Sequence, residues 1–383
     1  MKRTRREPSL GFESRVAEAL EAVTKEERGT LHLKAEPLYL DIMLKPIAHL
    51  LPSRYQKKDP RHPEQRPEAL AAVSASLRSE VNGLVYPFFY LTKAGGPESI
   101  ETRMRRKQGD QTIEAVWRVT PHPASGRPGP LAHRVHRAVE QLVTERGLPA
   151  SNPVPFSIYD LCRRMGIQAG GTEYRKVKAA LVAIRGTQVE SKGMFYSKSQ
   201  SQYVDQVFSL YDRLIFTGER LADGTIAEQN LLYLGTWYLE SLNSLYVKPL
   251  DYRFYLHLQT PISRRLYELL GVKFYRVAGR RDAVIRYRYS TLCRLLPVKR
   301  HTYRSRVRQQ LGAAHEELMR GAFLESAWDT PVPHQPDWYV WYRPGPKALE
   351  EIRVARTKKT YRRQDEKNGA HSSGLRGGRH DAG

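Results

Sequence analysis

One stretch of this chain occurs twice. The segment FSIYDLCRRMGI at 156–167 aligns with YRYSTLCRLLPV at 287–298, and both contain Leu-Cys-Arg. After a short turn, each copy continues with a basic segment whose apolar residues have the i, i+4 and i+7 spacing of a helix buried on one side. A β-prone segment, VESKGMFY or FLESAW, then follows. The order helix, turn, basic helix and β-ribbon predicts two winged helix-turn-helix units, in which the second helix enters the DNA major groove.

The expected core of each unit follows from the apolar positions of its second helix. These are Val177, Leu181 and Ile184 in the first copy and Val307, Leu311, Ala314 and Leu318 in the second. We interpret Cys162 and Cys293 as small buried residues where each helix pair packs. A helix is also expected before each copy, one over 131–146 and one that begins with Thr260 as its N-cap and Pro261 in its first turn.

The rest of the chain differs in composition from the repeats. Residues 1–80 are basic and punctuated by proline, and the β-prone runs LVYPFFYL and IEAVWRV lie between 81 and 119. The predicted fold class is α+β, with tandem winged helix-turn-helix domains, a small N-terminal β meander and flexible basic termini. The expected domains are 1–80, a largely flexible basic N-terminal region, 81–259, the β meander plus the first winged-helix domain, 260–345, the second winged-helix domain, and 346–383, a disordered basic tail.

The charge of the chain indicates what it binds. It has 63 Lys and Arg against 40 Asp and Glu, a formal net charge of +23 and a pI of about 10.0. Such an excess is typical of proteins that bind a polyanion. The apolar runs are far shorter than the ~20 residues that span a bilayer, and no apolar stretch follows the basic N-terminus as in a secretory signal. We therefore expect a cytoplasmic protein that binds nucleic acid and no membrane.

The helical wheel of each second helix indicates which side chains would face DNA. With the apolar stripe turned inward, steps of about 100° place a polar face opposite it. Because Arg pairs bidentately with guanine and Gln with adenine, we expect the second copy to read bases, whereas both copies grip phosphates. The candidate contacts are Thr172, Arg175, Lys176 and Lys178 in the first copy and His301, Thr302, Ser305, Arg306, Arg308 and Gln309 in the second.

The β-ribbons, or wings, supply further candidates. The expected strands are 189–196 and 203–216 around a polar SKSQSQ loop in the first copy, and 322–328 and 338–342 around DTPVPHQP in the second. Lys192, Lys198 and Arg343 are the expected phosphate contacts of the wings. Between the copies, a helix is expected around 237–245 and a strand over 250–258, both in the first domain.

Residue patterns for catalysis are weak. The chain has no GxxxxGK[ST] phosphate-binding loop, and two cysteines are too few for a disulfide scaffold or a cysteine-only zinc site. His133 and His136 form an HxxH that we interpret as a solvated helix face, so we expect no metal and no cofactor. His301 and Arg304 match the HxxR of tyrosine recombinases, with Trp328 and Tyr339 downstream, but recognition-helix and core residues explain this pattern better. We expect a protein that is not an enzyme.

Longer segments resemble a known family. PFSIYDLCRRMGI and TEYRKVKAALVAI, then PISRRLYELLGVKFYR, then YSTLCRLL and EELMRGAFLESAW, are similar to replication initiator proteins of iteron-containing plasmids, most closely the replication initiator protein A group. The resemblance covers about 81–345. It implies sequence-specific binding of double-stranded DNA at directly repeated origin sites (iterons), origin opening, and recruitment of a host initiator and the replicative helicase. It also implies self-association, with dimers acting in plasmid copy control and monomers in initiation.

Two other functions stay open at the level of the sequence. A winged-helix transcriptional repressor would bind equivalent sites but would neither open DNA nor support replication. A tyrosine recombinase would cleave DNA through a covalent tyrosine adduct. Supercoiled origin DNA separates the three functions, because the initiator opens strands, the repressor only binds, and the recombinase leaves the adduct.

The net charge generates a prediction on salt dependence. If the positive charge is used on phosphates, DNA affinity should fall by about 10³- to 10⁵-fold between roughly 50 and 200 mM salt, the response for about six to ten phosphate contacts. Fluorescence anisotropy with labelled duplex across a salt series measures the slope. A flat response would contradict the electrostatic interpretation.

Overall fold

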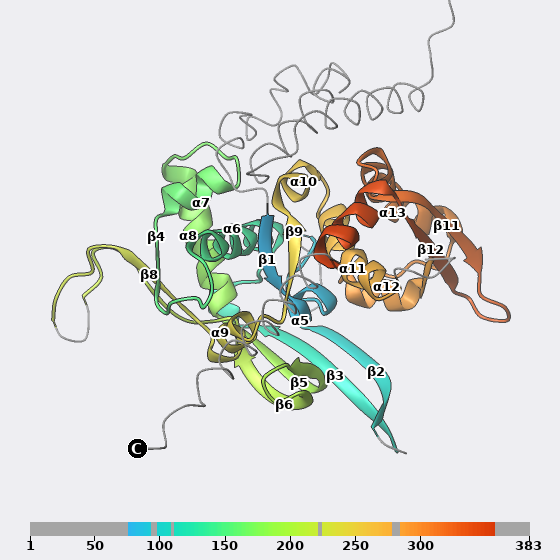
Figure 1. Cartoon of the computed structure of the whole chain (residues 1–383), viewed down its shortest axis with the longest axis horizontal. Helices are drawn as coiled ribbons and strands as arrows, with labels where there is room; N and C mark the ends of the chain where they lie inside the picture. The colour runs from blue at the N-terminus through green and yellow to red at the C-terminus, as the bar shows by residue number, and fades with distance from the viewer. Residues whose placement is uncertain (1–75, 93–97, 109–110, 221–223, 278–283, 357–383) are drawn as a thin grey trace, which may run out of the picture. The chain divides into compact units, whose positions relative to one another are not determined.

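The computed structural model describes residues 76–356, apart from 93–97, 109–110, 221–223 and 278–283 (Figure 1). Of the regions expected to be flexible, 1–75 and 357–383 lie outside this range. Residues 76–80, which were expected to be flexible as well, form a strand with buried residues. The described part is a mixed helix and sheet protein, as the sequence predicts. None of its helices combines the length and the apolar character needed to cross a bilayer.

Apart from one short 3-10 helix, the described helices have 5 to 17 residues, and the strands have 3 to 11. The helices are α5 (Val81–Val85), η1 (Pro123–Ser125), α6 (Pro130–Arg146), α7 (Ile158–Arg164), α8 (Gly171–Arg185), α9 (Thr236–Asn243), α10 (Tyr252–His257), α11 (Pro261–Val277), α12 (Tyr289–Leu295), α13 (Arg304–Arg320) and a helix at 346–356. The strands are β1 (Ser76–Glu80), β2 (Ile100–Gln108), β3 (Gln111–Pro121), β4 (Val154–Phe156), β5 (Thr187–Ser197), β6 (Gln202–Ser209), β7 (Tyr211–Ile215), β8 (Asn230–Leu234), β9 (Val247–Asp251), β10 (Ile285–Arg288), β11 (Leu324–Pro331) and β12 (Trp338–Pro344).

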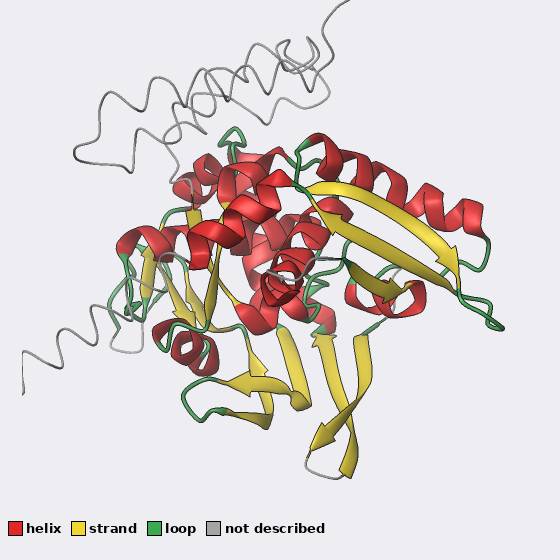
Figure 2. Ribbon diagram, turned by 45° about the vertical axis from the view of Figure 1, so that its right-hand side comes forward, coloured by secondary structure: helices red, strands yellow, loops and turns green. Residues whose placement is uncertain are grey.

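These strands form small antiparallel sheets (Figure 2). The sheet β2-β3-β5-β6 and the sheet β4-β8-β7 belong to the first half, and β10-β12-β11 belongs to the second. The strands β1 and β9 are far apart in the sequence, yet they pair from Ser76 opposite Asp251 to Glu80 opposite Val247. Two hydrophobic clusters fill the interior, one around α6 and α8 and one around α11 and α13.

The internal repeat is present in the structure as the same order of elements. The first copy runs β4, α7, α8 and the β5–β6 hairpin, and the second runs β10, α12, α13 and the β11–β12 hairpin. Ser157 caps α7, because its side chain accepts a hydrogen bond from Asp160 N at 3.0 Å. The predicted stripes on α8 and α13 are buried, and so are Cys162 and Cys293. The prediction of two helix pairs with buried inner faces is therefore confirmed.

The β segment near the N-terminus differs from the prediction. β2 and β3 form a hairpin, but LVYPFFYL is not a strand, because Leu84 and Val85 end α5 and residues 86–92 have no regular structure. Phe88, Phe89 and Tyr90 are all buried, whereas a strand with one solvated face would alternate. The hairpin also joins β5 and β6 instead of forming a separate meander.

Two other expectations about secondary structure need correction. The stretch 250–258 is not one strand, because β9 ends at Asp251, whose carboxylate caps α10 by accepting from Phe254 N at 2.9 Å. In the first wing, 203–216 divides into β6 and β7, which belong to different sheets. The tail expected from 346 onward is helical over 346–356, since Ala348 and Ile352, one turn apart, are buried in the second cluster. The domain division itself stays a prediction.

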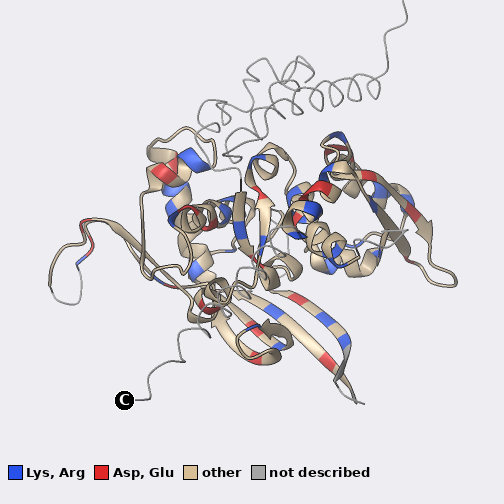
Figure 3. Cartoon of the chain, viewed as in Figure 1, with Lys and Arg blue, Asp and Glu red and all other residues tan. Residues whose placement is uncertain are grey.

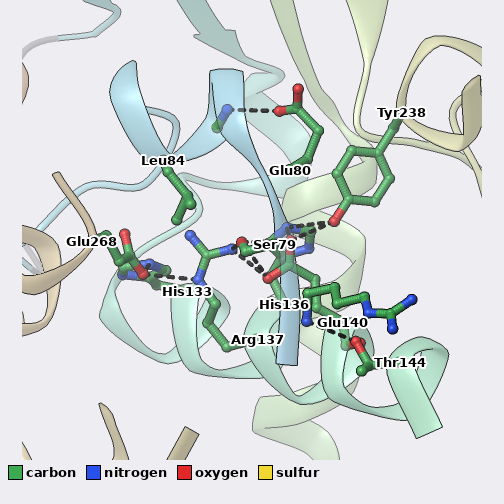
Figure 4. Close-up of polar contacts among 12 residues, drawn as sticks. Ser79, Glu80, Leu84, His133, His136, Arg137, Glu140, Thr144, Tyr238 and Glu268 are labelled. Atoms are coloured by element: carbon green, nitrogen blue, oxygen red, sulfur yellow. Dashed lines mark hydrogen bonds and ion pairs between the residues drawn. The ribbon is translucent and has the colours of Figure 1, made fainter. Parts of the chain in front are cut away.

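Helix α6 is buried around most of its circumference, which the sequence did not indicate. His133 and His136, expected on a solvated face, are both buried, as are Arg137 and Glu140. The reason is that β1 packs on α6 and that α11 supplies a buried carboxylate, Glu268, to its polar side chains. The polar side chains of α6 thus form hydrogen bonds and ion pairs with other buried side chains (Figure 4).

Arg137 lies at the centre of this network. Its Nε donates to Glu268 Oε1 at 2.8 Å, its Nη1 donates to Ser79 Oγ at 2.6 Å, and it also pairs with Glu140. His133 Nε2 lies 2.7 Å from Glu268 Oε1. Burial alone would raise the pKa of Glu268, but Arg137 and His133 hold it well below its usual range. Burial lowers the pKa of His133 to about 4, so the imidazole is neutral at pH 7.

The buried network generates a stability prediction. Arg265 Nη1 also donates to Glu268, at 3.2 Å from Oε2. Glu268→Gln therefore removes the carboxylate that Arg137 and Arg265 share, and removing one partner of a buried pair costs about 3–5 kcal/mol. Urea unfolding measures the change in the free energy of unfolding. The control is Glu316→Gln on the exposed side of α13, for which we expect a change within about 0.5 kcal/mol. Equal effects of the two variants would contradict a structural role for the network.

A second buried carboxylate generates a prediction on pH. Glu80 is buried, and this raises its pKa to about 7 although Gly83 N and Asn82 Nδ2 each donate to it at 2.7 Å. The native protein therefore keeps a proton between pH 4.5 and 7 that the unfolded chain releases, so this contribution to stability is lost as the pH rises. Glu80→Gln cannot titrate. Its stability relative to the natural protein should increase from about pH 5 to about pH 8 in urea titrations, and parallel pH curves would contradict this assignment.

Candidate nucleic-acid interface

The exposed face of α8 contains the candidates of the first copy. Since Val177, Leu181 and Ile184 are buried, the opposite side of the helix faces solvent. The four predicted contacts on this helix are all exposed: Thr172, Arg175, Lys176 and Lys178. Lys and Arg recur along this helix and along α13 (Figure 3).

Two of these lysines already have partners within the protein. Lys176 Nζ lies 2.8 Å from a carboxylate oxygen of Glu173, one turn earlier. Lys178 Nζ lies 4.1 Å from the centroid of the Phe216 ring, over its face. Both contacts are at the surface, where ion pairs and cation–π contacts contribute little, so a phosphate can replace them.

The exposed face of α13 and the turn before it contain the candidates of the second copy. Thr302, Ser305, Arg306, Arg308 and Gln309 are exposed, and His301 is half-buried. Arg306 Nη1 donates to Gln309 Oε1 at 2.8 Å, so the two expected base-reading side chains lie together. Arg308 is held differently, because its Nε donates to Asp329 Oδ1 on β11 at 2.8 Å.

The wing residues are exposed but lie at different positions. Lys192 is within β5, opposite Val116 of β3, and pairs with Glu190 at 3.1 Å, so it is not at the hairpin tip. Lys198 is at the turn between β5 and β6, and its Nζ donates to Leu245 O at 3.3 Å. Arg343 on β12 lies 3.4 Å from Glu325. The candidates of the first copy therefore lie on α8, on β5 and on the turn after β5, and those of the second lie on α13, on the turn before it and on β12. The structure does not bring Arg343 to the α13 side of the sheet, because Tyr342, the residue before it on β12, is the one that contacts α13.

Sequence reasoning missed two exposed side chains at the start of α13. Arg304, its first residue, pairs with Asp329, and its guanidinium lies 5.6 Å from the centroid of the Trp338 ring. Tyr303, the residue before the helix, is 75% exposed. The signal that could have found them is position, because residues at the N-terminal turn of a recognition helix contact base edges. The prediction rested on the angle of each residue from the buried stripe and took no account of its position along the helix.

Among the described residues, no group of three or more His, Cys, Asp and Glu side chains is placed to hold a metal ion. Burial raises the pKa of both Cys162 and Cys293 to about 11, which makes them poor nucleophiles. The recombinase candidates have other contacts, since Arg304 pairs with Asp329 and the Arg286 guanidinium lies 4.3 Å from the Tyr339 ring centroid.

The chain matches one family model and is similar to solved structures. The family model described as replication initiator protein A matches residues 86–315, which is more than half of the chain. A crystal structure of selenomethionine derivatives of domains 2 and 3 of RctB is similar, with 16% identity over 70% of this chain and 98% of that chain and a TM-score of 0.44. A second crystal structure of RctB domains 2–3 has 13% identity over 72% and 99% of the two chains and a TM-score of 0.35. No curated protein matches the sequence.

The extent of the family match settles the class. A chain with this match is a replication initiator by family. It belongs to the replication initiator protein A family, as its sequence predicts.

Proposed function

We propose that this protein is a sequence-specific, non-enzymatic DNA-binding initiator of plasmid replication that acts at directly repeated origin sites. The observation that supports this most is the repeated order of helix, turn, exposed basic helix and hairpin in a chain of an initiator family. On this proposal, the two copies are winged helix-turn-helix domains. The helix α8 and the helix α13 each enter a major groove of double-stranded DNA.

The two copies would contribute differently to recognition. Exposed side chains on α13 include Arg306 and Gln309, which have hydrogen-bonding groups for guanine and adenine. The exposed face of α8 is mainly cationic, which suits phosphates. Asp329, by pairing with Arg304 and Arg308, would position the first turn of α13 for the groove.

The proposed site is asymmetric. Two similar but unequal domains in one chain would occupy successive major grooves about 10 bp apart, so one chain would cover roughly two helical turns. A direct repeat fits such a chain, whereas a palindrome suits a symmetric dimer of single modules. Origin opening, recruitment of a host initiator and the replicative helicase, and self-association in copy control complete the proposal on family grounds. The candidate wing contacts Lys192, Lys198 and Arg343 would bind flanking phosphates.

Variants on the two helices test the division of roles. Arg306→Ala or Gln309→Ala should cost about 1–3 kcal/mol of binding free energy and relax the preference at one or two base pairs, because a base-edge contact is lost. Lys176→Ala or Lys178→Ala should weaken binding to all sequences alike and reduce the salt slope by about one unit each. Footprinting on DNA flanking the gene, followed by a base-by-base binding scan, measures both effects.

Several results of these assays would reject the proposal. A footprint of a single helical turn, a palindromic preference of the monomer, or unchanged specificity in both α13 variants would contradict the two-groove arrangement. On supercoiled origin DNA, binding without strand opening would indicate a repressor. A covalent adduct on Tyr339 would indicate a recombinase.

A further inference from the structure

The sheet β10-β12-β11 has one face that packs inward and one that faces solvent. Successive side chains of a strand point to opposite faces. On the inward face, Val340 and Tyr342 are buried in the second cluster, and His315 of α13 lies 3.2 Å from the Tyr342 hydroxyl. The residues of β12 that alternate with them, which are Tyr339, Trp341 and Arg343, therefore lie on the face away from α13.

The strand register aligns the outward residues in three rows across the sheet. The first row pairs Ser326 with Arg343, the second places Trp328, Trp341 and Arg286 side by side, and the third places Thr330, Tyr339 and Arg288 side by side. Each row thus contains one arginine, and two rows contain aromatic rings. We name this set the arginine–aromatic face, defined by Arg286, Arg288, Trp328, Tyr339, Trp341 and Arg343.

The rings and guanidinium groups of this face contact each other in a continuous series. The Trp328 and Trp341 rings are parallel, with centroids 5.9 Å apart. The Arg286 guanidinium lies 4.3 Å from the Tyr339 centroid and 5.0 Å from the Trp341 centroid. Arg343 lies over Trp328 and Arg288 over Tyr339, each at 5.9 Å. Flat surfaces and fixed positive charges therefore alternate across the face.

The charge of the face selects a kind of ligand. Its three arginines are exposed. The described acidic side chains of these strands do not neutralise all three, because Glu325 is 3.4 Å from Arg343 alone and Asp329 points to the other face, where it pairs with Arg304 and Arg308. Trp328 is 37% exposed, whereas tryptophan is highly buried on average in folded proteins. Anionic ligands with flat apolar groups fit this arrangement.

The geometry points to a binding site for single-stranded DNA on the arginine–aromatic face. Bases stack on aromatic rings and guanidinium planes, and the arginines pair with the phosphates between them. Sheet faces that display aromatic side chains bind two or three unstacked bases in other proteins in this way. Duplex DNA cannot use the face equally well, because its bases are already stacked on each other.

This site would extend the proposed function and rests on it, because origin opening produces the separated strand that the site would bind. The face is turned away from α13, so a duplex bound to the side chains of α13 and a single strand bound to the outer face would share only Arg343, the candidate wing contact to a flanking phosphate. The two activities are therefore separable by substitution.

The full-length protein tests this with fluorescein-labelled (dT)20 in anisotropy titrations. Trp328→Leu keeps an apolar side chain but removes the stacking surface, and we expect binding to weaken by about 5- to 150-fold, the range for one stacked base. Arg286→Gln should also weaken binding and reduce its salt dependence. Trp328→Tyr, which still stacks, should retain most of the affinity. The matched control is Tyr203→Leu on β6, an aromatic side chain of similar exposure (40%) on a different sheet, which should leave (dT)20 binding unchanged.

Binding of the origin duplex, measured in parallel, separates this proposal from the proposed function. Trp328→Leu and Arg286→Gln should leave duplex affinity and footprint unchanged, while Arg306→Ala should relax duplex specificity without weakening (dT)20 binding. The single-strand proposal is overturned if the natural protein does not bind (dT)20, if Trp328→Leu binds it normally, or if the outer-face variants weaken duplex and single strand by the same factor. Thermal unfolding checks that each variant is folded. If Trp328→Leu melts early, Arg286→Gln and Trp328→Tyr decide the outcome.

Discussion

The buried ion pair between Arg137 and Glu268 is the interaction on which the described structure depends. It joins α6, which precedes the first copy of the repeat, to α11, which precedes the second. Because removing either partner would leave a charge buried without compensation, the two helices cannot separate without exposing the whole network to water. Ser79 ties β1 to the same arginine, so the β1–β9 pairing shares this support. The network thus fixes α6 against α11 by polar contacts, where most helix pairs rely on apolar packing.

Local periodicity explains how much of the fold could be predicted from the sequence. The helices α8 and α13, with their buried stripes and the hairpins that follow, were predictable because the spacing of apolar residues within each segment indicates its secondary structure. The burial of His133 and His136 was not, since their environment comes from β1 and from Glu268, which is 135 residues away from His133. The same reason applies to LVYPFFYL, whose aromatic residues are buried by distant elements and not by a strand pairing of their own.

The candidate site was predictable in outline and incomplete in detail. All predicted side chains on α8 are exposed, and Arg306 and Gln309 lie together, because helical angle alone determines this. The role of Asp329 was missed, because a strand residue that holds Arg304 and Arg308 leaves no helical signal. The arginine–aromatic face is visible in the sequence as a strand pattern. Arg286 and Arg288 alternate with residues of the inner face at the period of a strand, and so do Tyr339, Trp341 and Arg343.

In the proposed initiator, the two faces of the strand β12 would contribute to two different functions. Its inward residues Val340 and Tyr342 are buried in the second cluster, and the Tyr342 hydroxyl contacts His315 of α13. Its outward residues Tyr339 and Trp341 contact each other and the Arg286 guanidinium of β10. Since the side-chain period of a strand is two, the residues that pack beneath α13 and the residues of the arginine–aromatic face alternate along the same seven residues. A substitution on one face of β12 therefore leaves the side chains of the other face in place, provided that the register with β10 and β11 is kept.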